Sequence, residues 1–156
     1  MKSNNKGFSL VELIIVIAIM AVLVGVLAPT YLQYVEKSKK SNDVSTVDSI
    51  VSAIEICAID PEVTTAGSWD LKIVVDTDGT TVTSSNAKMK AAFEAIVPTT
   101  TKLKSTKWDS ANNKFVITAT PDGDYGKVKI SMVTGGSDAN DEFHAYTTND
   151  KISKTS

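Results

Sequence analysis

Residues 6–29, KGFSLVELIIVIAIMAVLVGVLAP, set the architecture of this chain. From Phe8 to Ala28 the segment has 21 residues, is strongly apolar and carries Glu12 as its single charge. As an α-helix, a segment of this length spans about 30 Å, which is the thickness of the hydrocarbon core of a bilayer. The sequence therefore predicts a membrane-spanning helix over residues 8–29.

A secretory signal peptide is the first simpler interpretation of this segment. Signal peptides carry an apolar run of about 7–15 residues followed by a small-residue cleavage site. The uncharged run from Leu13 to Ala28 is slightly longer, and cleavage after Ala28 would place Pro29 directly behind the cut. Pro29 would make that site a poor substrate for an ordinary signal peptidase, so this interpretation is disfavoured.

A plain membrane anchor is the second simpler interpretation, and it does not explain the charged residue Glu12 within the apolar segment. A carboxylate at the bilayer centre costs about 2.5–3.5 kcal/mol, and the cost falls near the boundary, where Glu12 lies. Such a residue still calls for a cationic partner, and the span itself contains no basic residue. A cut between Gly7 and Phe8 would create one, because it would release a new α-amino group.

The composition limits the chemistry that the chain can perform. The net charge of −2 becomes −4 if Lys2 and Lys6 are lost with a leader, which argues against nucleic-acid binding. Cys57 is the single cysteine, so no intramolecular disulfide can form, and His144 is the single histidine. Zinc sites and His-activated nucleophiles usually need several such residues. We therefore expect no metal site, no cofactor and no enzymatic activity.

The octapeptide KGFSLVEL, residues 6–13, resembles the class III leader junction of type IV prepilins. The resemblance implies that a prepilin peptidase cleaves after Gly7 and methylates the amine of Phe8. It also implies that Glu12 pairs with the Phe8 amine of an adjacent copy during assembly. By the same resemblance, residues 1–7 form a leader that faces the cytoplasm. Charges on the two sides of the span do not fix the orientation by themselves.

The family resemblance implies a structural role with several partners. The chain would be a subunit, most simply a major pilin, of a type IV pilus. It would reside in the bilayer before assembly, with its head outside, and then join copies of itself in a helical homopolymer on the cell surface. The pilus assembly machinery of the inner membrane would be a further partner. A pseudopilin of a type II secretion or competence system is the alternative, and a minor tip pilin or an anchored enzyme are more distant ones.

One departure from the family concerns the C-terminal region. Many pilins close a C-terminal loop with a disulfide, and this chain cannot do so because Cys57 is alone. In this respect the chain resembles pilins of Gram-positive clostridia.

The helix is predicted to continue as an amphipathic segment over residues 30–59. Val44, Val47, Val51, Ile54 and Ala58 recur at three- and four-residue spacing, which predicts one apolar face. Cys57 lies on or beside this face and is interpreted as a small core residue.

A kink is predicted near Gly25 and Pro29. Proline cannot donate the backbone hydrogen bond to the carbonyl four residues earlier, which here is that of Gly25. A proline that merely marks the membrane exit remains the alternative interpretation.

Residues 60–156 predict a globular head that completes an α+β, type IV pilin-like fold, with the long helix packed on an antiparallel sheet. A polar connection is expected over residues 62–68, and a short helix near residues 86–97, capped by Ser85 or Asn86. Alternating apolar residues predict strands, the last of them in the C-terminal region. The predicted strands cover residues 71–76, 80–83, 102–108, 114–120, 127–133 and 142–147.

Charged clusters in the sequence have simple interpretations with functional alternatives. The aspartates of residues 76–79 indicate a turn, since the later Glu of a calcium loop is absent. The cluster at residues 37–40 indicates a solvated helix surface, with lipid headgroups or acidic surfaces of adjacent copies as alternative partners. Five acidic residues near turns raise the weaker possibility of a bound cation: Asp122, Asp124, Asp138, Asp141 and Glu142.

Overall fold

The structure is a computed structural model that describes residues 8–108, 113–123, 126–134, 143 and 152–154. The chain forms two compact units, residues 1–37 and residues 38–156, and each is described by itself. One helix, α1 (Leu10–Ala58), contributes its first part to the first unit and its last part to the second. The second unit, called the head below, joins the last part of α1 to residues 60–156, which were predicted as the globular head.

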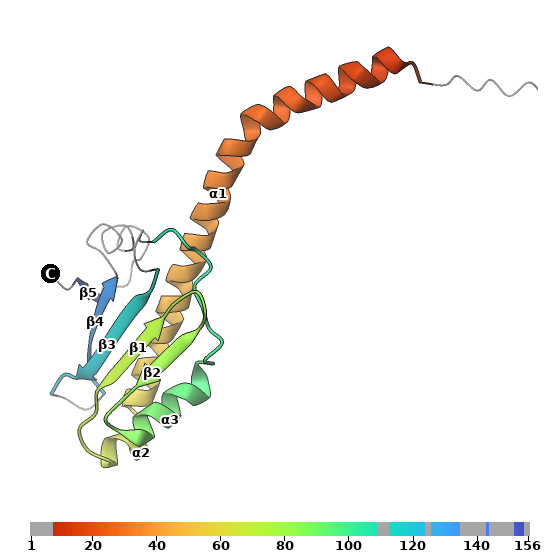
Figure 1. Cartoon of the computed structure of the whole chain (residues 1–156). Coiled ribbons are helices and arrows are strands. Elements are labelled where there is room, and N and C mark those ends of the chain that lie inside the picture. The colour runs from red at the N-terminus through yellow and green to blue at the C-terminus, as the bar shows by residue number, and fades with distance from the viewer. Residues whose placement is uncertain (1–7, 109–112, 124–125, 135–142, 144–151, 155–156) are drawn as a thin grey trace, which may run out of the picture. The chain divides into compact units, whose positions relative to one another are not determined.

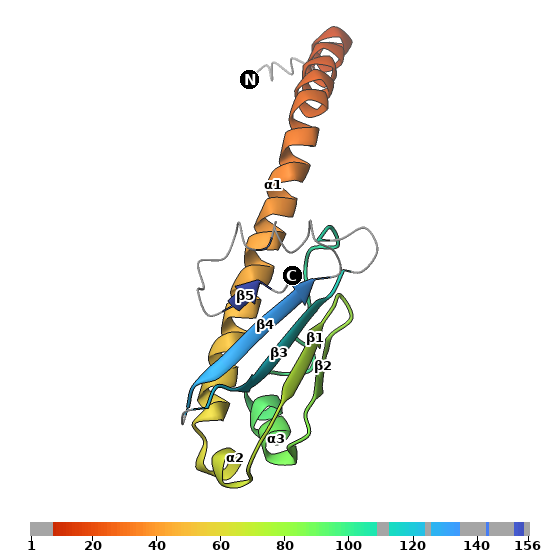
Figure 2. The same ribbon diagram turned by 90° about the vertical axis from the view of Figure 1, so that its left-hand side faces the viewer.

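The head contains a sheet of five strands, shown in Figure 1 and, turned by 90°, in Figure 2. The order in space is β2-β1-β3-β4-β5, and the pairs among the first four strands are all antiparallel. The α+β architecture is therefore confirmed. The short β5 joins the edge of β4 in parallel and was not predicted. The strands are β1 (Leu71–Val75), β2 (Thr80–Thr83), β3 (Phe115–Pro121), β4 (Val128–Thr134) and β5 (Ile152–Lys154).

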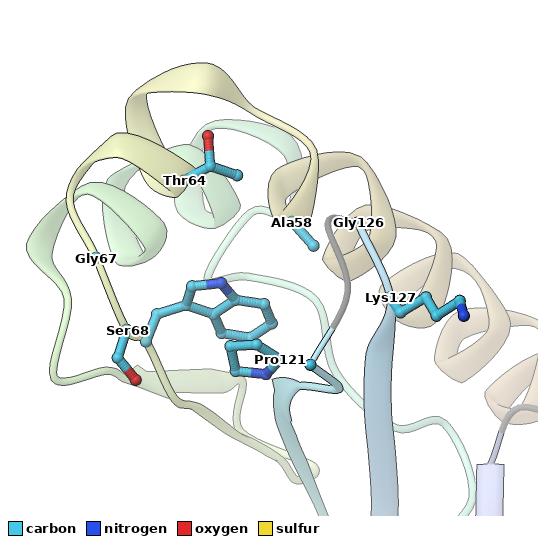
Figure 3. A pocket seen from close by; sticks show the side chains of 9 residues that line it. Ala58, Thr64, Gly67, Ser68, Pro121, Gly126 and Lys127 are labelled. Atoms are coloured by element: carbon cyan, nitrogen blue, oxygen red, sulfur yellow. The ribbon is translucent and has the colours of Figure 1, made fainter.

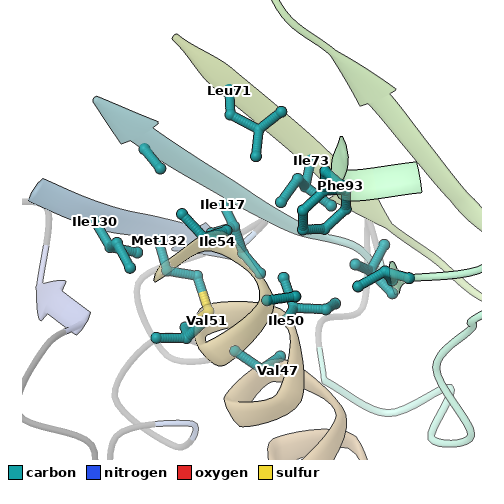
Figure 4. Packing of buried hydrophobic residues seen from close by; sticks show 14 of the residues in the cluster. Val47, Ile50, Val51, Ile54, Leu71, Ile73, Phe93, Ile117, Ile130 and Met132 are labelled. Atoms are coloured by element: carbon teal, nitrogen blue, oxygen red, sulfur yellow. The ribbon is translucent and has the colours of Figure 1, made fainter. Parts of the chain in front are cut away.

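The core lies between the last part of α1 and one face of the sheet (Figure 4). The register aligns inward-facing residues across strands, since Ile73 pairs with Ile117, and Ile117 pairs with Met132. Strand residues alternate between buried and more exposed positions, as expected of a sheet with one covered face. All five residues of the predicted apolar helix face are buried, which confirms that face: Val44, Val47, Val51, Ile54 and Ala58.

A second helix, α2 (Pro61–Thr65), occupies part of the region predicted as a polar connection. The Asp60 side chain accepts a 2.8 Å hydrogen bond from the Glu62 N–H and so acts as the N-cap, while Pro61 occupies the first helical turn. Asp followed by Pro is a strong helix-start signal, so the sequence contained the information for α2.

A third helix, α3 (Ala87–Ile96), matches the predicted short helix. Asn86 caps it by accepting hydrogen bonds from the N–H groups of Lys88 and Met89, at 2.9 and 3.2 Å. Met89 and Phe93 are buried in the head core. Between the two capping candidates, the structure therefore assigns the role to Asn86.

The predicted strand over residues 102–108 is wrong. This segment is irregular, although Leu103, Ser105 and Trp108 are buried. The physical reason is that the side chain of Asp43 on α1 binds backbone N–H groups of the segment, which therefore do not pair with a strand.

Two other predictions have different outcomes. The turn at residues 76–79 is confirmed, because Asp76 Oδ1 accepts hydrogen bonds of 2.8 and 2.9 Å from the N–H groups of Asp78 and Gly79.

The predicted strand over residues 142–147 lies outside the described residues except for Phe143, which is buried.

Candidate functional site

The proposed processing junction lies just before α1. Phe8 and Ser9 precede the first helical residue, Leu10, and the Phe8 side chain is 92% exposed in the single chain. Gly7 lies outside the described residues. On the described side of the junction the chain therefore has two non-helical residues before the helix begins.

Glu12 has a local partner that the sequence analysis missed. Its Oε2 atom accepts a 2.9 Å hydrogen bond from the Ser9 N–H, and the Ser9 carbonyl accepts one of 3.3 Å from the Leu13 N–H. Ser9 occupies the N-cap position and Glu12 the third helical position, so the pair follows one half of a capping box. The pattern S-x-x-E before an apolar run is a known signal for this arrangement and could have been recognised.

The first part of α1 carries a continuous apolar surface. Each large apolar side chain from Leu10 to Leu27 is at least half exposed in the single chain. This helix is long and apolar enough to cross a membrane. The criterion is one of length and composition, and signal sequences also meet it. An exposed apolar surface of this extent on a soluble protein indicates a missing partner, either lipid or protein.

Gly25 and Pro29 both lie inside α1, whose helical assignment continues through them. A Cβ atom added at Gly25 would meet no heavy atom within 4 Å, so packing within this chain does not require glycine there. The kink at these two residues stays a prediction.

The basic residues of the cluster at 37–40 differ in exposure. Lys37 is exposed, as predicted for a solvated surface, but Lys40 is buried. The Lys40 ammonium lies 5.1 Å from the ring centroid of Trp108, which is within the range of a cation–π contact. The helix surface interpretation is therefore wrong for Lys40, because an aromatic ring from the 103–108 segment covers it.

Asp43 is a second carboxylate that the sequence analysis missed. It is fully buried and accepts three hydrogen bonds: 2.7 Å from the Lys104 N–H, 2.9 Å from the Ser105 N–H and 2.8 Å from Trp108 Nε1. Buried charges are tolerated when hydrogen bonds satisfy them, as here. Asp43 lies four residues before the buried Val47, so its place on the apolar helix face was a readable signal.

Asp43 attaches the 103–108 segment to α1 and sets the position of an aromatic cluster. The Trp108 ring centroid lies 5.1 Å from that of Phe115, and the Phe115 centroid lies 5.2 Å from that of Phe143. Such edge-to-face contacts add stability beyond buried area. Asp43 therefore has a structural role, since all three of its partners donate hydrogen bonds to its carboxylate.

Cys57 is buried in the core, as predicted. Burial, with a smaller contribution from the charge of Asp60, raises the pKa of the Cys57 thiol from 9.0 to about 11. The thiol is therefore protonated at neutral pH and is a poor nucleophile.

Most of the acidic residues that were considered as cation ligands lie outside the described residues. Asp122 is exposed, and Asp124, Asp138, Asp141 and Glu142 lie outside the described residues. The weaker possibility of a cation at these residues is therefore untested, and the expectation of no metal site stays a prediction.

Comparison with known proteins adds evidence for the N-terminal segment. Residues 2–28 match the model of the prokaryotic N-terminal methylation motif. A type IV major fimbrial protein FimA of Dichelobacter nodosus is 37% identical over 91 residues, which cover 56% of this chain and 57% of the relative. A second protein of that name and organism is 42% identical over 60 residues, or 38% of each chain. A fimbrial protein of the same organism is 42% identical over 50 residues, or 32% of this chain and 31% of the relative.

These matches cover only part of each protein, since the chain spans about half the length, or less, of the curated relatives it matches. No solved structure gives a significant match. The methylation motif, the similarity to type IV major fimbrial proteins and the long-helix α+β fold together confirm the resemblance of this chain to type IV pilin precursors.

Proposed function

We propose that this chain is a structural, non-enzymatic subunit, a major pilin, of a type IV pilus. The observation that carries the proposal is the methylation motif over residues 2–28, placed at the start of an exposed apolar helix. A prepilin peptidase cleaves after Gly7 and methylates the Phe8 amine. The exposed position of Phe8 outside the helix supports access to this bond.

Polymerisation then transfers the apolar surface of α1 from lipid to neighbouring copies. In the bilayer this surface already avoids water, so the hydrophobic effect contributes little to association, and packing and polar contacts decide it. Glu12 supplies the polar contact, because a carboxylate among apolar helices is costly unless it is paired. The Phe8 amine of an adjacent copy is the partner that cleavage provides.

The local hydrogen bond of Glu12 is compatible with this pairing. Oε2 accepts from the Ser9 N–H, and none of the described residues donates to Oε1. A carboxylate can accept on both oxygens. Glu12 can therefore hold the helix start in its own chain and receive the amine of a neighbour at the same time, which orients the carboxylate before assembly.

The location follows from the same steps. Before assembly the chain spans the inner membrane once, with its leader in the cytoplasm and its head outside, and it contacts the bilayer and the pilus assembly machinery there. After assembly it lies in an extracellular filament.

Electron microscopy of cells with and without the gene tests the proposal. We expect long surface fibres that disappear on deletion, return with the wild-type gene and react with an antibody against the head. Unchanged fibres on deletion would contradict a major pilin, and loss of protein secretion or DNA uptake with no long fibre would support a pseudopilin instead.

A further inference from the structure

A pocket of about 290 Å³ opens at one end of the head, beside α2 (Figure 3). The last residue of α1, the loop that follows α2 and the connection between β3 and β4 line it. All of these residues belong to the head unit. The proposed pilin function does not use this pocket.

Glycine backbone forms much of the pocket wall. Gly67, Gly123 and Gly126 line it, and these are the three described residues with positive φ, at 93°, 72° and 77°. Such angles favour glycine, which has no Cβ. At Gly126 an added Cβ would also lie 2.8 Å from Cγ2 of Ile59. The pocket is thus shaped by backbone turns that only glycine adopts readily.

Trp69 contributes an indole N–H to the lining of this pocket. The residue lines the pocket and is only 6% exposed, yet none of the described residues accepts a hydrogen bond from its Nε1–H. The indole N–H can only donate. Buried donors in folded proteins almost always have a partner in protein, water or ligand. The Trp69 N–H therefore has no acceptor among the described residues and is available to donate to an oxygen atom of a bound molecule.

Hydroxyl groups and apolar surface complete the lining. The Thr64 hydroxyl donates towards the carbonyls of Asp60 and Pro61, at 3.1 and 3.2 Å, so its oxygen can still accept a hydrogen bond. No described residue is bonded to the exposed Ser68 hydroxyl, which can donate and accept. The pocket therefore offers donors and acceptors together.

The lining disfavours strongly charged ligands. Lys127 is the one cationic residue among the described lining residues, whereas phosphate sites usually gather several charge-assisted donors. The described residues also contain no group of three His, Cys, Asp or Glu side chains that could hold a metal ion. A neutral ligand with several hydroxyl groups on a compact, partly apolar ring fits the mixture of groups present.

From these observations we propose that the pocket beside α2 binds a neutral saccharide unit, with the Trp69 N–H donating to one of its oxygens. The Thr64 and Ser68 hydroxyls contact further hydroxyl groups of the sugar. This inference concerns the head alone, so it stands or fails independently of filament formation.

The two tryptophans of the chain provide the experiment. The full chain is labelled with ¹⁵N at the indole nitrogens and held in micelles of a detergent without a sugar headgroup. It is titrated with methyl glucoside, methyl galactoside and N-acetylglucosamine. We expect the Trp69 indole signal to shift saturably with at least one of them. The Trp108 indole signal should stay in place, because its N–H is bound to Asp43.

A Trp69→Phe variant keeps an aromatic ring and removes the donor. The affinity of this variant for the sugar, measured from the backbone amide signals of Gly67 and Gly126, should be about threefold to tenfold weaker. This is the factor expected for one hydrogen bond. An unchanged Trp108 signal verifies that the core is intact. If that signal moves, Thr64→Val serves instead and should weaken binding by a similar factor. Ser49→Ala, an exposed hydroxyl on α1, should leave affinity unchanged.

Three results would overturn the inference. The first is that none of the three sugars moves the Trp69 signal, and the second is that both indole signals move together without saturation. The third is a larger saturable shift with glucuronate, titrated in parallel, than with any of the three neutral sugars, which would assign the pocket to an acidic ligand.

Discussion

Glu12 and Asp43 are two carboxylates on one helix, and their surroundings differ. Asp43 is fully buried and accepts three hydrogen bonds from its own chain. Glu12 is exposed in the single chain and accepts one hydrogen bond from the described residues, that of the Ser9 N–H. Asp43 is therefore satisfied by folding, whereas Glu12 keeps the capacity to accept from another molecule.

The apolar residues around the two carboxylates differ in the same way. Those near Glu12 are at least half exposed, while those near Asp43, such as Val47 and Ile50, are buried against the sheet. One helix thus serves two purposes. Residues 38–58 complete a head that is stabilised within the chain, and residues 10–27 present an exposed apolar surface that lipid or other copies cover in the proposed function. Changes at the two sites should therefore have separable effects.

The largest expected effect is on head stability after Asp43→Ala. The change leaves two buried donors and one partly buried donor without their acceptor, so the free energy of unfolding should fall by about 3 kcal/mol or more. Urea unfolding of the full chain in micelles, followed by tryptophan fluorescence, measures it. Ser41→Ala, an exposed position on the same helix, is the control and should change the value by less than about 0.5 kcal/mol. A loss below about 1 kcal/mol for Asp43→Ala would show that water replaces the carboxylate.

The next effect concerns assembly after substitution of Glu12. Glu12→Ala removes both the charge and the local hydrogen bond, whereas Glu12→Gln can keep the hydrogen bond, since glutamine also serves in capping boxes. We expect both variants to insert into the membrane with unchanged head stability. Both should yield at least about tenfold less sheared filament, which corresponds to 1.4 kcal/mol.

The two variants of Glu12 also separate its two roles. Loss of filaments in Glu12→Ala but not in Glu12→Gln would assign assembly to the helix cap rather than to charge pairing. Normal filaments from both variants would refute an assembly role for this residue.

A smaller effect on the head is expected from Asn86→Ala. The change removes the cap of α3 and should lower the free energy of unfolding by about 1 kcal/mol. Asn86→Ser should recover most of this loss, because serine is also a strong N-cap residue. Filament yield should not change. If both substitutions left the stability unaltered, the cap would contribute nothing measurable.

Near neutral pH the smallest effect is expected at Cys57. Its pKa of about 11 in the folded head, against 9.0 as the ordinary value, means that the unfolded chain loses the thiol proton first as pH rises. The free energy of folding that the raised pKa of Cys57 contributes is therefore present in full below pH 9 and is lost between pH 9 and pH 11.

Iodoacetamide labelling of the Cys57 thiol should be slow at pH 8 and should accelerate in Asp43→Ala. Fast labelling of the wild type at pH 8 would contradict the buried, protonated thiol.

Local patterns predicted most of the fold because periodicity reports which face is covered. The apolar face of residues 44–58, the helix near residues 86–97 and the alternation of β3 and β4 were all readable in this way. The segment 102–108 was not, because its conformation depends on Asp43, which lies about sixty residues earlier in the sequence and binds its backbone. Contacts between distant segments leave no periodic signal.

The candidate sites were readable to different degrees. The family resemblance predicted roles for Gly7, Phe8 and Glu12, and these roles stay predictions. The motif match over residues 2–28 supports the resemblance itself. The Ser9–Glu12 hydrogen bond was available as a local pattern and was missed. The Trp69 pocket could not have been predicted, since it joins the loop behind α2 to the connection of β3 and β4.

The most direct test of the proposed pilin function is the intact mass and N-terminal sequence of the subunit in sheared surface filaments. The proposal predicts a chain that begins at Phe8 and carries one methyl group on its amine. A subunit that still contains residues 1–7, or that begins at Pro29 as after an ordinary signal peptidase, would contradict it.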